Sequence, residues 1–370
     1  MLRRQPRPWR RPLAPPTLAA LLVSGCAQPE EHELPEVLWQ GERIEFRSYA
    51  PDDLVCGGTF EHLDRRAAHL ADVFGVEPGL IQYTWAPGKT IMNHCPVLAT
   101  GCSKDRQVFS TRASHEHELV HALRDSAHRG LEEGLAVAFG DDRMLQRIDG
   151  ADVSRTLFEI DEDHPPASTQ YHQLGHFVSF IAAHYGIEAL VDLDHASRRS
   201  DGFGELEARV LETLGDPLPE VVTEYNVAYP DCEVPEFRYD GLECGSEGVE
   251  FPLAPGATTA VSVPVACEDP NTVGSFVGEV FKRVRIDVPE RGAYAIEIAV
   301  PQGTIQPYWR FGPCGVGCLF EVVEPDSLVQ KLPCVDAGAY TLRVGLDAST
   351  PGDFEVKLSH LESETCLPGG

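Results

Sequence analysis

The sequence lacks a long hydrophobic run. No segment reaches the roughly 20 apolar residues of a membrane-spanning helix, and the run TLAALLVSG at 17–25 is far shorter. It also lacks long low-complexity tracts and blocks of one charge sign, which excludes a disordered or fibrous chain. We therefore expect 370 residues with 42% hydrophobic composition to fold outside the membrane as two domains.

Basic residues are scarce beyond the N-terminus. The first 16 positions hold five of the 30 basic residues, so the remainder carries 25 basic against 58 acidic residues, a formal net charge of −33. Such a surface repels nucleic acid and anionic membranes, so we expect neither as a partner.

The N-terminus has the features of an export signal, with five arginines followed by the short apolar run. The run ends at Leu22-Val-Ser-Gly-Cys26, which resembles a bacterial lipobox, so residues 1–26 are expected to be a lipoprotein-type signal with Cys26 lipidated. Ala27 follows the cysteine, which favours the outer membrane or cell surface. The alternative is an ordinary cleaved signal and a secreted protein. Residues 27–41 are expected to be a tether.

Ten further cysteines form an even set, which suits five disulfides in an oxidising compartment. Their connectivity cannot be deduced from the sequence. Cys95 with Cys102 and Cys314 with Cys318 are close enough to pair locally. The alternative for Cys314 and Cys318, a zinc knuckle, lacks a second close pair.

Residues 42–229 are predicted to form an α+β domain. Strand patterns at 43–49, 81–85 and 107–111 alternate with a helical pattern at 59–73, and further helical patterns follow at 171–185 and 205–214. A linker at 230–249, rich in Pro, Asp and Cys, then precedes a change of pattern.

Residues 250–370 are predicted to form an all-β sandwich. Alternating runs at 280–288, 294–298, 340–344 and 354–358 are separated by turn residues, and RGAYAIEI at 291–298 is echoed by AGAYTLRV at 337–344. The region resembles the pre-peptidase C-terminal type of β-sandwich that accompanies exported bacterial peptidases. That resemblance implies no catalytic residue here.

The stretch from Ser114 to Ala136 carries the chemistry. His117-Glu118-Leu-Val-His121 has the form H-E-x-x-H, in which two imidazoles on one helix face can bind zinc and the glutamate can act as general base on a water molecule. Ser114 is expected to cap this helix, and Leu119, Val120 and Leu123 to bury its other side.

A catalytic zinc needs a third protein ligand. The metzincin pattern is excluded, because Arg124 and Ala127 stand where it requires glycine and histidine. The thermolysin-like pattern is also absent, because Val137 occupies the position four residues after Glu133 that would hold an aspartate.

Leu131-Glu-Glu133-Gly-Leu-Ala136 is similar to the L-x-E-G-[LF]-A helix of gluzincin metallopeptidases of the aminopeptidase N and peptidase MA-like kind. This resemblance implies a zincin-like fold, zinc ligation by His117, His121 and Glu133, and Glu118 as general base. Eleven residues separate His121 from Glu133, fewer than in aminopeptidase N, and no G-x-M-E-N signature lies upstream. An aminopeptidase is therefore not indicated.

Neighbouring residues receive simpler interpretations. His115 and Glu116 are expected to face solvent or cap the helix, and Glu132 to be solvated, with a fallback role as ligand. Tyr171 and His172, at the start of a later helix, are the candidates for stabilising an oxyanion, with His176 considered beside them.

Two functions follow as expectations. The first is an exported, lipid-anchored zinc peptidase, an endopeptidase acting on proteins or peptides with one catalytic zinc ion. The second is a non-catalytic surface binding or adhesion lipoprotein on a peptidase-like scaffold.

Overall fold

In the computed structural model, all described helices and strands belong to residues 35–370. The structure describes residues 33–51, 55–77, 79–95, 99–124, 128–140, 152–160, 168–228, 237–240, 248–249, 257–276, 279–299, 308–318, 320–322, 329–347 and 352–361.

A five-stranded mixed sheet begins this part of the chain, in the order β1-β2-β3-β5-β4. Its strands are β1 (Val37–Gln40), β2 (Ile44–Ser48), β3 (Ile81–Trp85), β4 (Gly101–Lys104) and β5 (Gln107–Ser110). The central strands β2, β3 and β5 run parallel, and β1 and β4 are antiparallel edges. Apolar side chains with no exposed surface, such as Ile44 and Tyr83, join this sheet to the core.

Helix α1 (Gly58–Phe74) makes the crossover that the parallel strands β2 and β3 require. It buries Leu63, Ala67 and Leu70 in the core of the sheet. The helix ends at Gly75, whose φ of 60° is the left-handed conformation that glycine adopts most readily.

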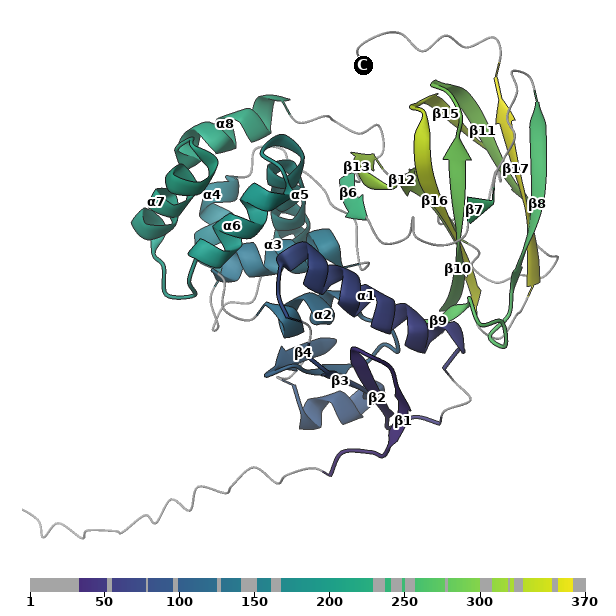
Figure 1. Cartoon of the computed structure of the whole chain (residues 1–370), viewed down its shortest axis with the longest axis horizontal. Helices are drawn as coiled ribbons and strands as arrows, with labels where there is room; N and C mark the ends of the chain where they lie inside the picture. Colours follow the sequence, from purple (N-terminus) through teal and green to yellow (C-terminus); the bar gives the residue numbers. More distant parts are fainter. Residues whose placement is uncertain are drawn as a thin grey trace, which may run out of the picture. The chain divides into compact units, whose positions relative to one another are not determined.

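The remaining helices of the first domain follow the sheet, apart from the short 3-10 helix η2 (Gly88–Asn93) between β3 and β4. They are α2 (Glu116–Leu123), α3 (Arg129–Phe139), α4 (Val153–Glu159), α5 (Ser168–His184), α6 (Ile187–Ala196), α7 (Phe203–Leu214) and α8 (Leu218–Ala228) (Figure 1).

Helix α3 is buried along its length, from Gly130 to Phe139. A Cβ atom on Gly134 would lie 2.6 Å from Val178 Cγ2 and 3.0 Å from the carbonyl oxygen of Leu174, both on α5. The glycine that follows Glu133 therefore allows α5 to lie close against α3.

Two β-sheets form the C-terminal part and share one hydrophobic core. One sheet has the order β14-β12-β16-β10-β7, with β9 also paired to β10, and the other has the order β15-β11-β17-β8 (Figure 1). The strands are β7 (Gly248–Val249), β8 (Thr258–Val265), β9 (Val273–Phe276), β10 (Glu279–Val288), β11 (Gly292–Ala299), β12 (Tyr308–Pro313), β14 (Phe320–Val322), β15 (Val329–Val335), β16 (Gly338–Asp347) and β17 (Gly352–His360). Strands β6 (Phe237–Asp240) and β13 (Gly315–Cys318) form a separate antiparallel pair.

The repeated Gly-Ala-Tyr segments occupy equivalent positions in the two sheets. Tyr294 on β11 donates its hydroxyl hydrogen to the carbonyl oxygen of Glu290 at 2.7 Å, and Tyr340 on β16 does the same to Asp336 at 3.0 Å. Burial raises the pKa of Tyr340 to about 12, so this hydroxyl remains a donor at neutral pH. The echo therefore marks two matching strand starts.

The start of α1 is joined covalently to the sandwich. Cys56 forms a disulfide with Cys267, 211 residues later, and lies in the sandwich core. The backbone nitrogen of Cys56 donates to the carbonyl oxygen of Gly274 at 2.9 Å, and that of Gly58 donates to Thr272 at 3.1 Å. This connection was not expected from the sequence.

Cys95 and Cys102 also form a disulfide, as their spacing predicted. Cys314 and Cys334 each take part in a disulfide, which excludes the zinc knuckle considered for Cys314.

The expected combination of helices with several sheets, followed by a two-sheet sandwich, is confirmed. The expected tether at 27–41 extends too far, because β1 at its end pairs with β2. The expected linker at 230–249 includes β6 and β7, which pair with strands of the C-terminal part. These short strands lack the alternation that identifies longer ones, and the domain bounds 42–229 and 250–370 remain predictions.

The signal at 1–26, the lipidation site Cys26 and the first residues of the expected tether lie outside the described residues, as do Cys232, Cys244 and Cys366. Among the helices that the structure describes, none combines the length and hydropathy needed to cross a membrane.

We predict that the disulfide across the two parts contributes more stability than the local one. Closing a loop over a separation of 211 residues removes more unfolded-state entropy than closing one over 7, about 5 against about 2.5 kcal/mol in the chain-entropy model. Cys56→Ser with Cys267→Ser should therefore lower the free energy of unfolding, measured in denaturant, by about twice as much as Cys95→Ser with Cys102→Ser. Equal losses would contradict this assignment.

Candidate metal centre

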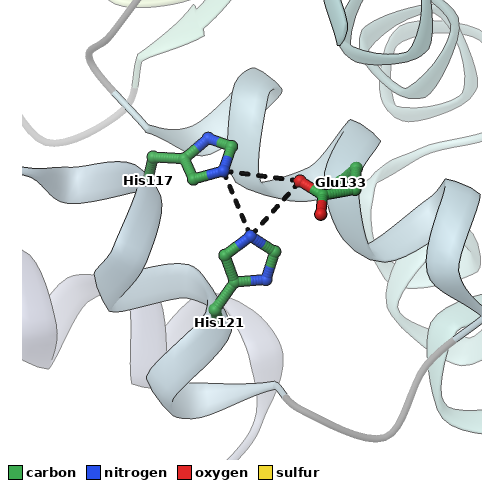
Figure 2. A group of neighbouring side chains, drawn as sticks. All are labelled: His117, His121 and Glu133. Carbon is green, nitrogen blue, oxygen red and sulfur yellow. Dashed lines mark hydrogen bonds and ion pairs between the residues drawn. The ribbon is translucent and has the colours of Figure 1, made fainter. Parts of the chain in front are cut away.

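Helix α2 presents two histidines on one face. His117 and His121 are four residues apart, one helical turn, and their Nε2 atoms lie 3.1 Å from each other (Figure 2). On the opposite side of the helix Leu119 and Val120 have no exposed surface, while Leu123 packs against the core from a partly buried position. This apolar side fixes the rotation of α2 and so turns both imidazoles toward α3.

Helix α3 supplies the third group. Glu133 Oε2 lies 3.5 Å from His117 Nε2 and 3.4 Å from His121 Nε2 (Figure 2). The three atoms form a nearly equilateral triangle, the single group of three potential metal ligands found within the described part of the chain. Ligand atoms about 2.05 Å from a tetrahedral ion are about 3.3 Å apart, so the triangle fits an ion of that kind.

The two oxygens of Glu133 have different surroundings. Oε1 pairs with Arg129 Nη2 at 2.6 Å, whereas the buried Oε2 faces only the two imidazole nitrogens, at 3.4 and 3.5 Å, among the interactions of the described residues. A buried carboxylate oxygen in that position is costly unless a cation or donor compensates it. The arrangement therefore fits a divalent metal ion bound through His117, His121 and Glu133.

Glu132 orients one of the histidines. Its Oε1 lies 3.0 Å from His121 Nδ1, and the side chain is 3% exposed. The expectation that Glu132 is solvated, or a fallback ligand, is therefore wrong. The helical spacing turns Glu132 to a different side of α3 from Glu133, and the sequence gives no sign that this side is covered. In the structure α2 packs against it and buries Glu132. A carboxylate on Nδ1 leaves the lone pair of Nε2 directed at the metal position.

His121 and Glu133 shift each other's pKa values in opposite directions. Burial disfavours a charged His121, but the charge of Glu133 and the hydrogen bonds of Glu132 and Glu133 outweigh it and raise the pKa of His121 to about 10. Burial likewise opposes ionisation of Glu133, yet the charge of His121 and hydrogen bonds from both histidines hold its pKa well below the usual range. In the metal-free protein a proton on His121 therefore balances the carboxylate.

Glu118 is buried beside the edge strand β4, with 6% of its surface exposed. A Cβ atom on Gly101 would lie 2.7 Å from Glu118 Cγ, 2.7 Å from Glu118 Oε1 and 2.7 Å from His115 Nδ1. Glycine at this position thus leaves the space that the Glu118 carboxyl occupies. No motif in the sequence marks Gly101, because it acts through a contact made in the folded chain.

The first residues of the stretch are buried, contrary to expectation. His115 is 2% exposed and its Nδ1 lies 2.9 Å from Ser110 Oγ, while Glu116 is 3% exposed and pairs with side chains of α1 and β10. Ser114 does not cap the helix: the cap position is His115, and no side-chain capping bond forms. These residues read as polar surface in sequence, but two neighbouring elements cover them.

The candidates on α5 divide into two groups. The ring of Tyr171 lies 6.0 Å from that of His117, and Tyr171 also interacts electrostatically with Arg129. His176 Nδ1 instead lies 3.0 Å from the hydroxyl of Tyr225, within the helical core. His172 is partly buried. The fold therefore brings Tyr171 close to the first of the two histidines.

Comparisons with known proteins identify only distant likenesses. No model of a protein family matches the chain, and no curated protein sequence matches it. One similar solved structure is the pre-peptidase C-terminal domain of a collagenase from Bacillus anthracis, with 12% identity over 30% of this chain and 95% of that chain, at a TM-score of 0.22. Another is a cycloisomaltooligosaccharide glucanotransferase from Paenibacillus sp., with 15% identity over 33% of this chain and 19% of that chain, at a TM-score of 0.15. At these scores neither likeness supports a functional inference.

We predict that metal binding releases about one proton at pH 7. His121, with its pKa of about 10, is protonated in the metal-free protein, and a metal ion requires the neutral imidazole. Protons compete with the metal below that pKa, so the apparent affinity should rise about tenfold per pH unit between roughly pH 7 and pH 9.

Isothermal titration calorimetry in two buffers of different ionisation enthalpy measures the released proton directly. His121→Ala should abolish binding and serves as the control. An affinity independent of pH would contradict the prediction.

Proposed function

We propose that the protein is a zinc-dependent peptidase whose first domain has the zincin-like fold of a gluzincin. The observation that carries the proposal is the triangle of His117, His121 and Glu133, with the buried Glu118 directly after the first histidine. Two imidazoles and one carboxylate are a donor set of catalytic zinc, which keeps its fourth position open. A purely structural zinc site is usually closed by four protein ligands.

Each residue of the site then has a role. A bound zinc ion would supply Lewis-acid chemistry, polarising the scissile carbonyl and lowering the pKa of a water molecule. Glu118 accepts the proton of the attacking water and passes it to the leaving amine. Glu132 holds His121 in the binding tautomer, and the Tyr171 hydroxyl donates a hydrogen bond to the developing oxyanion.

We propose that the substrate is a protein or peptide outside the cytoplasm and that cleavage is internal. The disulfides Cys56–Cys267 and Cys95–Cys102 support an oxidising compartment. A lipid anchor at Cys26 would hold the enzyme at the outer membrane or cell surface, and a cleaved signal would release it instead.

Replacing the general base tests the enzyme proposal. Glu118→Gln should keep about one zinc per chain, because the three ligands are unchanged, yet lower the cleavage of casein or a peptide library by about 10²–10⁴-fold. Glu61→Gln, on the exposed face of α1, is the matched control and should cleave normally. Zinc-replete wild-type protein that cleaves no peptide would instead favour a binding or adhesion protein on a peptidase-like scaffold.

Filling the space beside the base is a second test. In Gly101→Ala the new Cβ would overlap Glu118 and displace its carboxyl, and a displacement of about 1 Å can cost about 100-fold in rate. We expect kcat to fall by about 10- to 100-fold while the zinc content stays at one. Gly204→Ala, where a Cβ meets nothing within 4 Å, is the control. An unchanged kcat in Gly101→Ala would show that Glu118 does not need its present position.

A further inference from the structure

The first turn of the metal helix α2 is held by a side chain instead of a cap. Helix α2 has only eight residues, and its N-cap His115 makes no side-chain capping bond. Glu116, the first helical residue, is 3% exposed and directly precedes the ligand His117. Whatever fixes Glu116 therefore fixes the position of the first metal ligand.

Glu116 is fixed by three basic side chains from two elements. Its Oε1 lies 2.6 Å from His62 Nε2 and 3.4 Å from Arg283 Nη2, and its Oε2 lies 2.7 Å from Arg66 Nε. His62 and Arg66 belong to α1, whereas Arg283 belongs to strand β10 of the sandwich. The carboxylate thus connects the metal helix to both parts of the chain.

The protonation state of His62 is consistent with its hydrogen bonds to Glu116 and Arg283. Burial, together with the charge of Arg283, lowers the pKa of His62, so its ring is neutral at pH 7. With its proton on Nε2 the ring donates to Glu116, and its Nδ1 accepts from Arg283 Nη1 at 3.0 Å. Arg66 also donates to the carbonyl oxygen of Phe139, the last residue of α3. The network therefore reaches both helices that carry metal ligands.

Arg283 is aligned with other arginines of the sandwich. It pairs across the sheet with Arg343 on β16, which in turn pairs with Arg310 on β12. Arg343 lies over the ring of Phe281 at 3.6 Å, and Arg283 lies 4.9 Å from the same ring. Adjacent like charges on one face of a sheet repel each other. The buried carboxylate of Glu116, which pairs with Arg283, offsets this repulsion between the arginines of the sandwich.

The position of Arg283 relative to α1 is held by independent contacts. The Thr59 hydroxyl donates to the carbonyl oxygen of Gly274 at 2.6 Å and accepts from the Gly274 nitrogen at 3.0 Å, one turn before His62. The disulfide Cys56–Cys267 holds the same end of α1. Together these contacts hold the start of α1 against the part of the sandwich that carries Arg283.

We propose that Arg283 is a positioning residue of the metal centre, so that the β-sandwich completes the site by holding Glu116 and the first turn of α2. The inference rests on the metal site of the proposed function and does not depend on peptide hydrolysis. A buried carboxylate that loses one of its cationic partners is strongly destabilised where it stands. In the absence of Arg283 the first turn of α2 therefore shifts or frays, and His117 moves with it.

The test compares three variants of the full chain. Arg283→Met keeps an apolar stem but removes the charge. Arg285→Met removes a half-exposed arginine two residues away that pairs with Asp287. Val356→Ala weakens the sandwich core without changing any residue of the network around Glu116. Zinc affinity is measured by competition with a chelator, and hydrogen exchange of the α2 amides is measured in the metal-free protein.

We expect Arg283→Met to lower zinc affinity by about 10-fold and to speed exchange in α2 by a similar factor, within the range of about 2- to 30-fold typical of energetic coupling between sites. Arg285→Met and Val356→Ala should leave both quantities unchanged, although Val356→Ala lowers overall stability. If Arg283→Met binds zinc as tightly as the wild type and its α2 amides exchange at the same rate, the inference is overturned. An equal loss of affinity in Val356→Ala would also overturn it, because the effect would then be general destabilisation.

A double variant tests whether Arg283 acts through Glu116. Glu116→Gln combined with Arg283→Met should lose no more affinity than the worse single variant, whereas additive losses would overturn the route through Glu116. Should Arg283→Met fail to fold, Arg283→Lys takes its place, with a smaller loss expected. Because exchange is measured without metal, a wild type that binds zinc but cleaves nothing would refute the peptidase and leave this inference standing.

Discussion

Four buried carboxylates impose the main constraint on this fold. Glu116, Glu118, Glu132 and Glu133 lie within 18 residues of sequence, and none is more than 6% exposed. A buried carboxylate is tolerated only when cations or hydrogen-bond donors compensate the loss of water. The side chains that act as those partners come from α1, α2, α3 and β10.

The four carboxylates are compensated in different ways, and the differences separate their roles. Glu116 is surrounded by fixed basic groups, and Glu132 faces His121 Nδ1 and Arg129. Glu133 has one oxygen on Arg129 and the other directed at the two imidazoles. Glu118 instead occupies a space kept open by Gly101. A metal ion would complete the surroundings of Glu133, whereas in the proposed peptidase Glu118 is the carboxylate that would exchange protons with a substrate water.

The sandwich is more closely involved with the metal helices than a separately folded binding module would be. A disulfide, backbone hydrogen bonds at the start of α1 and the Arg283–Glu116 pair all join it to the first domain. Cys56 even belongs to the core of the sandwich while preceding a helix of the first domain by two residues. Separating the two parts would therefore expose the charge network around Glu116, which directly precedes His117, a candidate metal ligand.

The sequence by itself determined the local features of this protein. The spacing of His117 and His121 predicted that both lie on one helix face, and periodicity located α1, α5, α7 and the main sandwich strands. The resemblance of the segment around Glu133 predicted a third metal ligand there, and the structure places the Glu133 carboxylate close to both histidines. Short strands such as β1 and β7 escaped notice because a few residues carry no measurable alternation.

Only the tertiary structure decided which of the remaining polar residues matter. His62, Gly101 and Arg283 lie between 17 and 167 residues from the glutamates they contact, so no local pattern could reveal them. Glu116 and Glu132 looked like solvent-facing helix positions, because sequence periodicity describes one helix and not the neighbours that cover it. A charged side chain is buried only where a neighbouring element packs over it. For Glu116 and Glu132 that burial, which only the folded chain produces, is what makes them part of the site.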